Sequence, residues 1–218
     1  FTDRTVFGRM KMMSMAGKYI CLSGGEGSGK TTVIDQLRLE YPDAVFVREP
    51  GGTPFGSSLR QLLLGRQYAP DPWTELFLLM ADRIELYHRV VRPALNDGAT
   101  VISDRCWIET LVYQILTKIG LDAVPLFLDL MRRSGCLMPN LWIWLDIDPS
   151  TGLARRQASG EMNSFDADAL ELHEKYRQGF GKVATLLPQM LTVRIDAGQA
   201  RDAVFAAVKT AIMDIQGH

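Results

Sequence analysis

A glycine-rich segment that ends in lysine and threonine is the part of the sequence with the clearest chemistry. Residues 24–31 read GGEGSGKT and match the pattern GxxxxGK[ST], between an apolar run and a helical pattern. Glycines allow a tight turn in which several backbone N–H groups face phosphate oxygens. Lys30 can then reach the outer phosphates of a triphosphate, and the Thr31 hydroxyl can ligate Mg²⁺. The pattern predicts that ATP and Mg²⁺ are bound by Gly24, Gly25, Glu26, Gly27, Ser28, Gly29, Lys30, Thr31 and Thr32.

Four further polar segments follow in order along the chain. REPGGT occupies residues 48–53, ADR residues 81–83, DR residues 104–105 and YQ residues 113–114. Together with the glycine-rich loop, these segments resemble the bacterial thymidylate kinase family, and the likeness extends from about residue 19 to the C-terminus. The resemblance implies a P-loop kinase that uses ATP and Mg²⁺ to phosphorylate dTMP and that forms a homodimer.

The DR pair carries the roles nearest to the transferred group. The resemblance implies that Arg105 binds the 5′-phosphate of the acceptor, and a planar guanidinium suits this because it donates two parallel hydrogen bonds. Arg105 and Lys30 are the expected catalytic residues on this side of the site. Asp104 follows an apolar strand pattern, where a carboxylate can hold Mg²⁺ directly or through water. An ordinary surface ion pair between Asp104 and Arg105 is the alternative interpretation.

The acceptor pocket is expected from residues that match the family's motifs. Arg83 and Gln114 are the expected base readers, since both can hydrogen-bond to the edge of a pyrimidine, and Thr110 matches a family position close to the base. The alternative is that Gln114 and Thr110 simply face solvent. Glu26 matches an acidic position near the acceptor's sugar. The expected acceptor contacts are Glu49, Pro50, Arg60, Leu79, Arg83, Arg105, Thr110 and Gln114.

The chain departs from the family pattern around this pocket. Cys106 follows the DR pair in place of Tyr or His, and Ile115 follows the YQ pair in place of Gly, so the helix there should continue without a break. Leu79 stands where an aromatic ring usually stacks on thymine. Leucine can cover the face of a ring but lacks an aromatic quadrupole.

A short lid, expected at about residues 155–168, is a further departure. The family places arginines in this mobile segment, where they stabilise the charge on the transferred phosphoryl group. Gln157 and Ser159 occupy such positions here, and the segment is several residues shorter. Arg155 and Arg156 are therefore the candidate catalytic cations on the lid side, although a solvated helix face explains them equally well.

Composition limits the class of protein. The 218 residues, 47% hydrophobic and 22% charged, are ordinary for one globular domain. A net charge of −1 gives no basic field for nucleic acid or an anionic membrane, and no run approaches the ~20 apolar residues that span a bilayer. The cysteines at 21, 106 and 136 lack close spacing, which predicts buried thiols without a disulfide framework or metal cluster and fits the cytoplasm.

Short apolar runs alternate with helical patterns, which predicts an α/β fold, a five-stranded parallel sheet flanked by helices, in a single domain at 18–218. Strands are expected at 19–23, 44–47, 100–103, 141–147 and 191–195, with 141–147 central. Helices are expected at 30–40, 53–64, 73–96, 107–118, 122–133, 149–158, 166–187 and 201–215, the third stopping or bending near Pro93. Residues 1–17 are interpreted as a disordered leader or cloning remnant.

Two expectations concern residues outside these motifs. His88, His173 and His218 show no ligand spacing and are interpreted as structural or exposed. Tyr176 is interpreted as a half-buried helix residue, and the alternative is that it approaches the base or sugar of the acceptor. The helices at 107–118 and 122–133 carry apolar residues that could form a homodimer surface, although core packing explains them equally well.

Three functions remain open from the sequence. The motifs favour a dTMP kinase. Leu79 and Ile115 suggest a kinase for another or a modified pyrimidine nucleoside monophosphate. The lid, which is poor in arginine, suggests a non-catalytic relative that only binds nucleotides.

Overall fold

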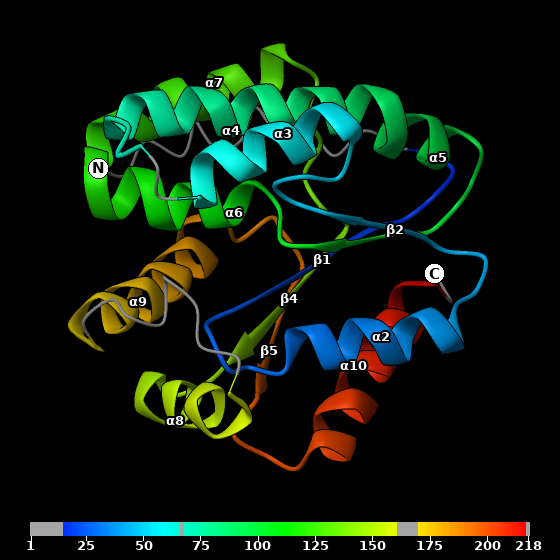
Figure 1. Cartoon of the computed structure of the whole chain (residues 1–218). Helices are drawn as coiled ribbons and strands as arrows, with labels where there is room; N and C mark the ends of the chain where they lie inside the picture. Colours follow the sequence, from blue (N-terminus) through cyan, green and yellow to red (C-terminus); the bar gives the residue numbers. More distant parts are fainter. Residues whose placement is uncertain (1–14, 66–67, 161–169, 217–218) are drawn as a thin grey trace.

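A single parallel sheet organises the chain. The structure is a computed structural model that describes residues 15–65, 68–160 and 170–216. Its five strands lie in the order β2-β3-β1-β4-β5, and every neighbouring pair is parallel (Figure 1). The strands are β1 (Tyr19–Gly24), β2 (Val45–Arg48), β3 (Val101–Asp104), β4 (Leu141–Asp146) and β5 (Thr192–Asp196). The predicted five-stranded α/β fold is confirmed, but the central strand is β1, and β4 lies beside it.

Helices cover both faces of the sheet because successive side chains of a strand point to opposite sides. On β1, Ile20 and Leu22 pack with α2 (Lys30–Glu40) and α10 (Arg201–Gln216). Tyr19 and Cys21 point the other way, into a larger core. That core is built with α4 (Pro72–Leu86), α7 (Val124–Arg133) and α9 (Leu170–Leu186). Figure 1 shows α2 and α10 below the sheet and α4 and α7 above it.

The long helix expected at 73–96 continues through Pro93. After α4 the chain forms a π-helical turn, η1 (Tyr87–Val91), and then α5 (Arg92–Asn96). Proline lacks the N–H group that an α-helix needs and its ring crowds the preceding turn. The wider turn, in which the Arg92 N–H donates to the Tyr87 carbonyl, lies directly before this position and replaces the expected stop or bend.

The helix expected at 107–118 also continues, as the isoleucine at 115 predicts. It begins as α6 (Trp107–Thr110) and extends as a π-helix, η2 (Leu111–Ile119), up to Gly120. Its apolar residues Trp107, Ile108, Leu111 and Ile115 are fully buried in the core. Core packing therefore accounts for them, and they do not provide the dimer surface that was one interpretation of this segment.

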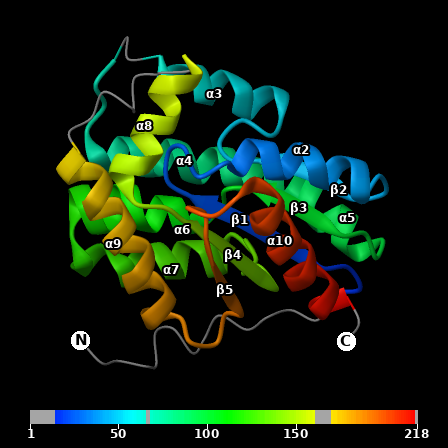
Figure 2. The ribbon, with the colours of Figure 1, turned by 90° about the horizontal axis from the view of Figure 1, so that it is seen from below.

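Three elements remain. The 3₁₀ turn η3 (Leu121–Ala123) contacts η2 and α7. Helices α3 (Pro54–Leu64) and α8 (Pro149–Ser159) border the carboxyl ends of the strands, where α8 and α9 lie side by side (Figures 1 and 2). The predicted lid lies partly, and the predicted leader mostly, outside the described residues. None of the described helices combines the length and the apolar character needed to cross a membrane.

Candidate active site

A large cavity opens at the carboxyl ends of β1, β3 and β4. Its volume is about 650 Å³, and its walls come from the glycine-rich loop, the residues after β3, and helices α4, η2, α8 and α9. Ligands of open parallel sheets bind outside the carboxyl ends of the strands, because the connecting loops and helix N-termini gather there. The cavity therefore lies where the fold favours a ligand.

The glycine-rich loop forms one end of the cavity, between β1 and α2. Gly27 has a positive φ of 71°, and a Cβ there would lie 2.0 Å from the Gly152 carbonyl oxygen. Only glycine permits this close approach of the loop to α8. Gly25, Glu26, Lys30 and Thr31 line the cavity, whereas the other predicted members do not contribute to its lining: Gly24, Gly27, Ser28, Gly29 and Thr32.

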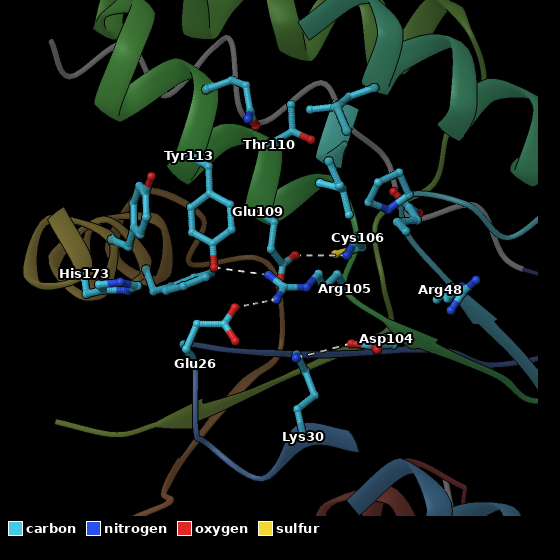
Figure 3. Close-up of a pocket in the computed structure, with 18 of the residues that line it drawn as sticks. Glu26, Lys30, Arg48, Asp104, Arg105, Cys106, Glu109, Thr110, Tyr113 and His173 are labelled. Carbon is cyan, nitrogen blue, oxygen red and sulfur yellow. Dashed lines mark hydrogen bonds and ion pairs between the residues drawn. The ribbon is translucent and has the colours of Figure 1, made fainter. Parts of the chain in front are cut away.

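Lys30 and Asp104 meet in the floor of the cavity. The Lys30 Nζ lies 3.5 Å from Asp104 Oδ1 (Figure 3). Burial, and next the nearby Arg105, lower the pKa of Lys30. Apart from this ion pair with Lys30, Asp104 Oδ1 is buried and has no hydrogen-bond partner among the described residues. Mg²⁺ prefers oxygen ligands, and both the Asp104 carboxylate and the Thr31 hydroxyl line the cavity, so these two residues could hold the ion.

Arg105 projects into the middle of the cavity from the turn after β3. Its backbone has a positive φ of 70°, which a non-glycine residue seldom adopts, and its N–H donates to the Leu22 carbonyl. The guanidinium donates to Tyr113 Oη at 3.2 Å and pairs with Glu26 Oε1 at 3.3 Å. Burial alone would lower the pKa of Arg105, but Tyr113 and then Glu26 raise it, so the side chain keeps its charge.

Arg83 and Glu49 form a buried ion pair on the acceptor side. Arg83 Nε donates to Glu49 Oε2 at 2.7 Å, and its Nη2 donates to Thr110 Oγ1 at 2.8 Å. Both charged side chains are at most 3% exposed. Burial raises the pKa of Glu49 to about 7 even with Arg83 beside it. Thr110 is therefore buried against Arg83, and the solvent-exposed alternative for this residue is wrong.

The other expected acceptor contacts also line the cavity. Gln114 Nε2 approaches Glu75 Oε2 at 3.4 Å, and Lys118 Nζ donates to the same oxygen at 2.7 Å. Arg60 Nη1 donates to the Pro50 carbonyl at 2.9 Å. The structure brings together all eight predicted residues: Glu49, Pro50, Arg60, Leu79, Arg83, Arg105, Thr110 and Gln114.

The two candidate lid arginines point to different places. Arg156 lines the cavity, and its Nε lies 3.9 Å from Glu26 Oε2. Arg155 donates instead to the carbonyls of Ala197 (2.7 Å) and Gly198 (3.1 Å), which follow β5, and is not among the cavity's lining residues. The geometry therefore supports the prediction for Arg156 and gives no support to the one for Arg155.

Sequence reasoning missed one wall of the cavity, which α9 supplies. His173, interpreted from the sequence as structural or exposed, lines the cavity together with Phe180 and with Tyr176, for which a place near the acceptor was the alternative interpretation. The Tyr176 ring packs on Tyr113 at 4.4 Å between centroids. Arg177 pairs with the buried Asp146 at the end of β4, which fixes the helix against the sheet. The spacing 173, 176, 177 and 180, one face of a helix, is the signal that could have indicated this wall.

Glu109, on α6, is a further cavity residue that sequence reasoning missed. It is buried, lines the cavity, and accepts a hydrogen bond from the Cys106 N–H at 2.9 Å, as Figure 3 shows. A glutamate three residues after a helix's first flanking residue commonly caps that helix. The spacing of Cys106 and Glu109 could have predicted the cap but not its place beside the phosphate side of the cavity.

Comparison with known proteins agrees with this geometry. Residues 22–208 match the thymidylate kinase family. The thymidylate kinase of Gloeobacter violaceus is 38% identical over 205 residues, which cover 89% of this chain and 93% of the relative. Those of Alkalilimnicola ehrlichii (37%, covering 90% and 92%) and Carboxydothermus hydrogenoformans (33%, covering 93% and 100%) are similar over comparable lengths. With this match over most of its length, the chain belongs to the thymidylate kinase family.

Proposed function

We propose that this protein transfers the terminal phosphoryl group of ATP to dTMP and releases dTDP and ADP. One observation carries the proposal: a single cavity contains the Lys30 loop for a triphosphate and, facing it, the set of Arg83, Thr110 and Gln114 for an acceptor. Two phosphate-bearing substrates can therefore meet within one enclosure. The relatives' name, thymidylate kinase, identifies the acceptor class.

Transfer requires positioning and charge stabilisation and needs no covalent intermediate on the protein. An oxygen of the acceptor's phosphate attacks the terminal phosphorus of ATP, and the bond from that phosphorus to the bridging oxygen breaks as ADP leaves. Lys30, Arg105 and Arg156 supply the positive charge around the transferred group. Thr31 and Asp104 would hold Mg²⁺, which when bound neutralises phosphate charge.

Selection of the base rests on the buried polar wall. Arg83 is held by Glu49 and Thr110, yet a guanidinium has five N–H donors, so donors remain for a carbonyl of the base. Gln114 lies at the cavity wall, where its amide can bond to the ring edge. Leu79 covers the ring through apolar contact. A base that leaves these buried groups without partners binds poorly.

A panel of acceptors tests this function. Purified enzyme with ATP and Mg²⁺ is given dTMP, dUMP, dCMP, UMP or GMP, and diphosphate formation is measured. We expect the highest kcat/KM with dTMP, and a loss of about tenfold in the Gln114→Ala variant. Gln178→Ala, an exposed glutamine on α9, is the control and should behave as wild type.

Two results would contradict the proposal. A higher kcat/KM for any other monophosphate would identify a different acceptor. Binding of both ATP and dTMP, seen by calorimetry, without any diphosphate after long incubation would identify a non-catalytic nucleotide-binding protein.

We further infer that the protein acts as a homodimer in the cytoplasm. Trp73 and Phe77 support the first part, because both are exposed on α4 and their rings stack at 6.5 Å between centroids. Exposed aromatic clusters of this kind are typical of interfaces. The three cysteines are all free thiols in the structure, which fits a reducing compartment.

A further inference from the structure

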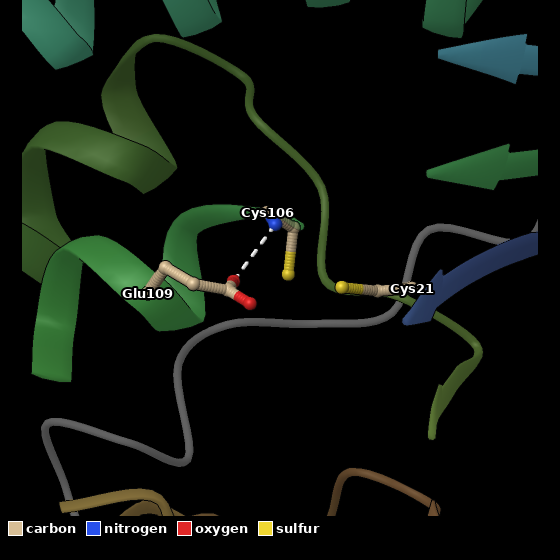
Figure 4. A group of neighbouring side chains, drawn as sticks. All are labelled: Cys21, Cys106 and Glu109. Atoms are coloured by element: carbon tan, nitrogen blue, oxygen red, sulfur yellow. Dashed lines mark hydrogen bonds between the residues drawn. The ribbon is translucent and has the colours of Figure 1, made fainter. Parts of the chain in front are cut away.

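Two cysteines and a glutamate converge beside the phosphate side of the cavity. Cys21 lies on β1, Cys106 follows the turn at Arg105, and Glu109 lies on α6 (Figure 4). Their two sulfur atoms and a carboxylate oxygen all lie within 4.8 Å of one another. The sequence predicted isolated thiols and no metal cluster, because Cys21 and Cys106 are too far apart along the chain to form a recognisable motif. The parallel pairing of β1 with β3 brings them together in space.

The glutamate in this cluster has an unsatisfied oxygen. Glu109 Oε2 accepts the Cys106 N–H, and the Ser23 hydroxyl also acts on this carboxylate, but Oε1 is buried and makes no hydrogen bond of ordinary geometry among the described residues. Glu109 is only 5% exposed, and Cys21 and Cys106 are at most 1% exposed. An unpartnered buried carboxylate oxygen is costly, of the order of 1–3 kcal/mol or more. The protein therefore presents a buried oxygen acceptor next to two thiols.

We propose that Cys21, Cys106 and Glu109 form a binding site for one Zn²⁺ ion. Two thiolates and one carboxylate are a ligand set that zinc accepts, whereas Mg²⁺ prefers oxygen ligands alone. Around one tetrahedral zinc ion the ligand atoms lie about 3.3–3.8 Å apart, so the observed span needs only small side-chain movements. The hydroxyl of Ser23, 3.7 Å from the Cys21 sulfur, or a water molecule can complete the coordination.

Access suits such an ion, and positive side chains offset part of the charge it leaves. Burial raises the pKa of Cys21, Cys106 and Glu109, so zinc binding must release their protons. Two thiolates, one carboxylate and Zn²⁺ then give a net charge of about −1, and the positive side chains of Arg105 and Lys30 act on Glu109 from nearby. Cys106 and Glu109 line the cavity, so an ion can enter from it. The site would join β1, the turn after β3 and the start of α6. These are the elements that carry the glycine-rich loop and Arg105, so zinc would fix the phosphate side of the enzyme.

Metal titration of the full chain tests the site. The protein is reduced with a phosphine, freed of metal, and titrated with Zn²⁺ or Co²⁺ in the absence of nucleotides. We expect one ion per chain, an intense sulfur-to-cobalt charge-transfer absorption, and a rise in the melting temperature with Zn²⁺. Cys21→Ser, Cys106→Ser and Glu109→Gln should each weaken zinc binding, the cysteine variants by about 100-fold or more.

Cys136→Ser is the matched control. Cys136 is also a buried free thiol, but it does not belong to the cluster, so this variant should bind zinc as wild type does. Cooperative thermal unfolding without metal shows that each variant is folded. Failure of the wild type to bind zinc, or equal binding by Cys106→Ser, overturns the proposal. A disulfide between Cys21 and Cys106 that forms even when zinc is in excess would also overturn the proposal, and it would indicate an oxidisable thiol pair.

Discussion

Among single side chains, Arg156 and Arg155 offer a direct test of which cation serves the transferred group. Arg156 lines the cavity beside Glu26, whereas Arg155 binds the carbonyls of Ala197 and Gly198. We expect Arg156→Ala to lower kcat about 100-fold or more, because charge developing on the phosphoryl oxygens loses a partner. Arg155→Ala is the control and should change kcat much less. Equal losses of kcat in steady-state assays with both substrates saturating would contradict the assignment.

Glu49 gives a prediction about pH and stability. Its pKa is about 7 in the folded protein against an ordinary 4.5, so the folded state binds this proton more tightly than the unfolded state. The associated stability is fully present below about pH 4.5 and is lost as the pH rises through about 7. The pKa difference corresponds to at most about 3 kcal/mol.

Urea denaturation near pH 5 and near pH 8 measures this effect. The wild type should lose about 1–3 kcal/mol more free energy of unfolding over this range than Glu49→Gln, which carries no titrating carboxyl group. Comparing the change in the free energy of unfolding between the two pH values in wild type and in Glu49→Gln removes the contribution of the other titrating groups, which both proteins share. An identical change in the free energy of unfolding in the two proteins would show that Glu49 does not titrate in this range.

The sequence predicted the site residues that belong to local motifs. Lys30, Arg83 and Arg105 could be identified because each occurs at a defined place after a strand or within a helix, and all three line the cavity. Glu109 and His173 could not be identified in this way. Glu109 lies on α6, just after the turn at Arg105, and no motif marks it. The spacing of His173 with its neighbours marks one face of α9, but only the packing of α9 on η2, which are distant in the sequence, brings that face to the cavity.

At the level of elements, the contact between the glycine-rich loop and α8 sets the position of the phosphate site. A Cβ at position 152 would lie 2.2 Å from the Glu26 carbonyl oxygen, so Gly152→Ala must displace the loop or the helix. We expect this variant to be destabilised by about 1–3 kcal/mol and to have a raised KM for ATP. Thermal unfolding and steady-state kinetics measure both effects.

Gly181→Ala on α9 is the matched control for this contact. A Cβ there would meet only Trp144, at an ordinary distance of 3.8 Å, and alanine favours a helix over glycine. The control should therefore be at least as stable as wild type. An unchanged KM for ATP and an unchanged melting temperature in Gly152→Ala would show that the loop and α8 do not depend on their close approach.

The helical segments show what sequence patterns could not establish at this scale. Their positions were predicted within a few residues, because apolar periodicity and capping residues are local signals. The π-helical form of η1 and η2 was not predicted. Whether a helical turn becomes a wider π-turn depends on how the helix packs on the sheet and on its neighbours, as Leu111 and Ile115 of η2 do in the core. A π-turn also changes the spacing of apolar residues too little to be recognised in a single sequence.

For the whole molecule, the sheet explains why one chain can hold two substrates. The glycine-rich loop, Asp104 and Asp146 come from three neighbouring parallel strands, so they meet at one edge, and the helices on both faces close the cavity around them. Strand order was not available from the sequence. The pairing of β1 between β3 and β4 depends on long-range contacts, and it is this pairing that places Lys30 beside Asp104.

Assembly is the remaining prediction at this scale. Trp73 and Phe77 are 39% and 54% exposed, and they lie four residues apart on the outer face of α4, away from the cavity-lining Leu79 and Arg83. If this face joins two copies, Phe77→Asp should convert a dimer into a monomer, because a buried charge without a partner is costly. Leu39→Asp, at a leucine on α2 that is 83% exposed, is the control and should leave the dimer intact. Light scattering after size-exclusion chromatography gives the masses, and a dimeric Phe77→Asp or a monomeric wild type would contradict the proposed interface.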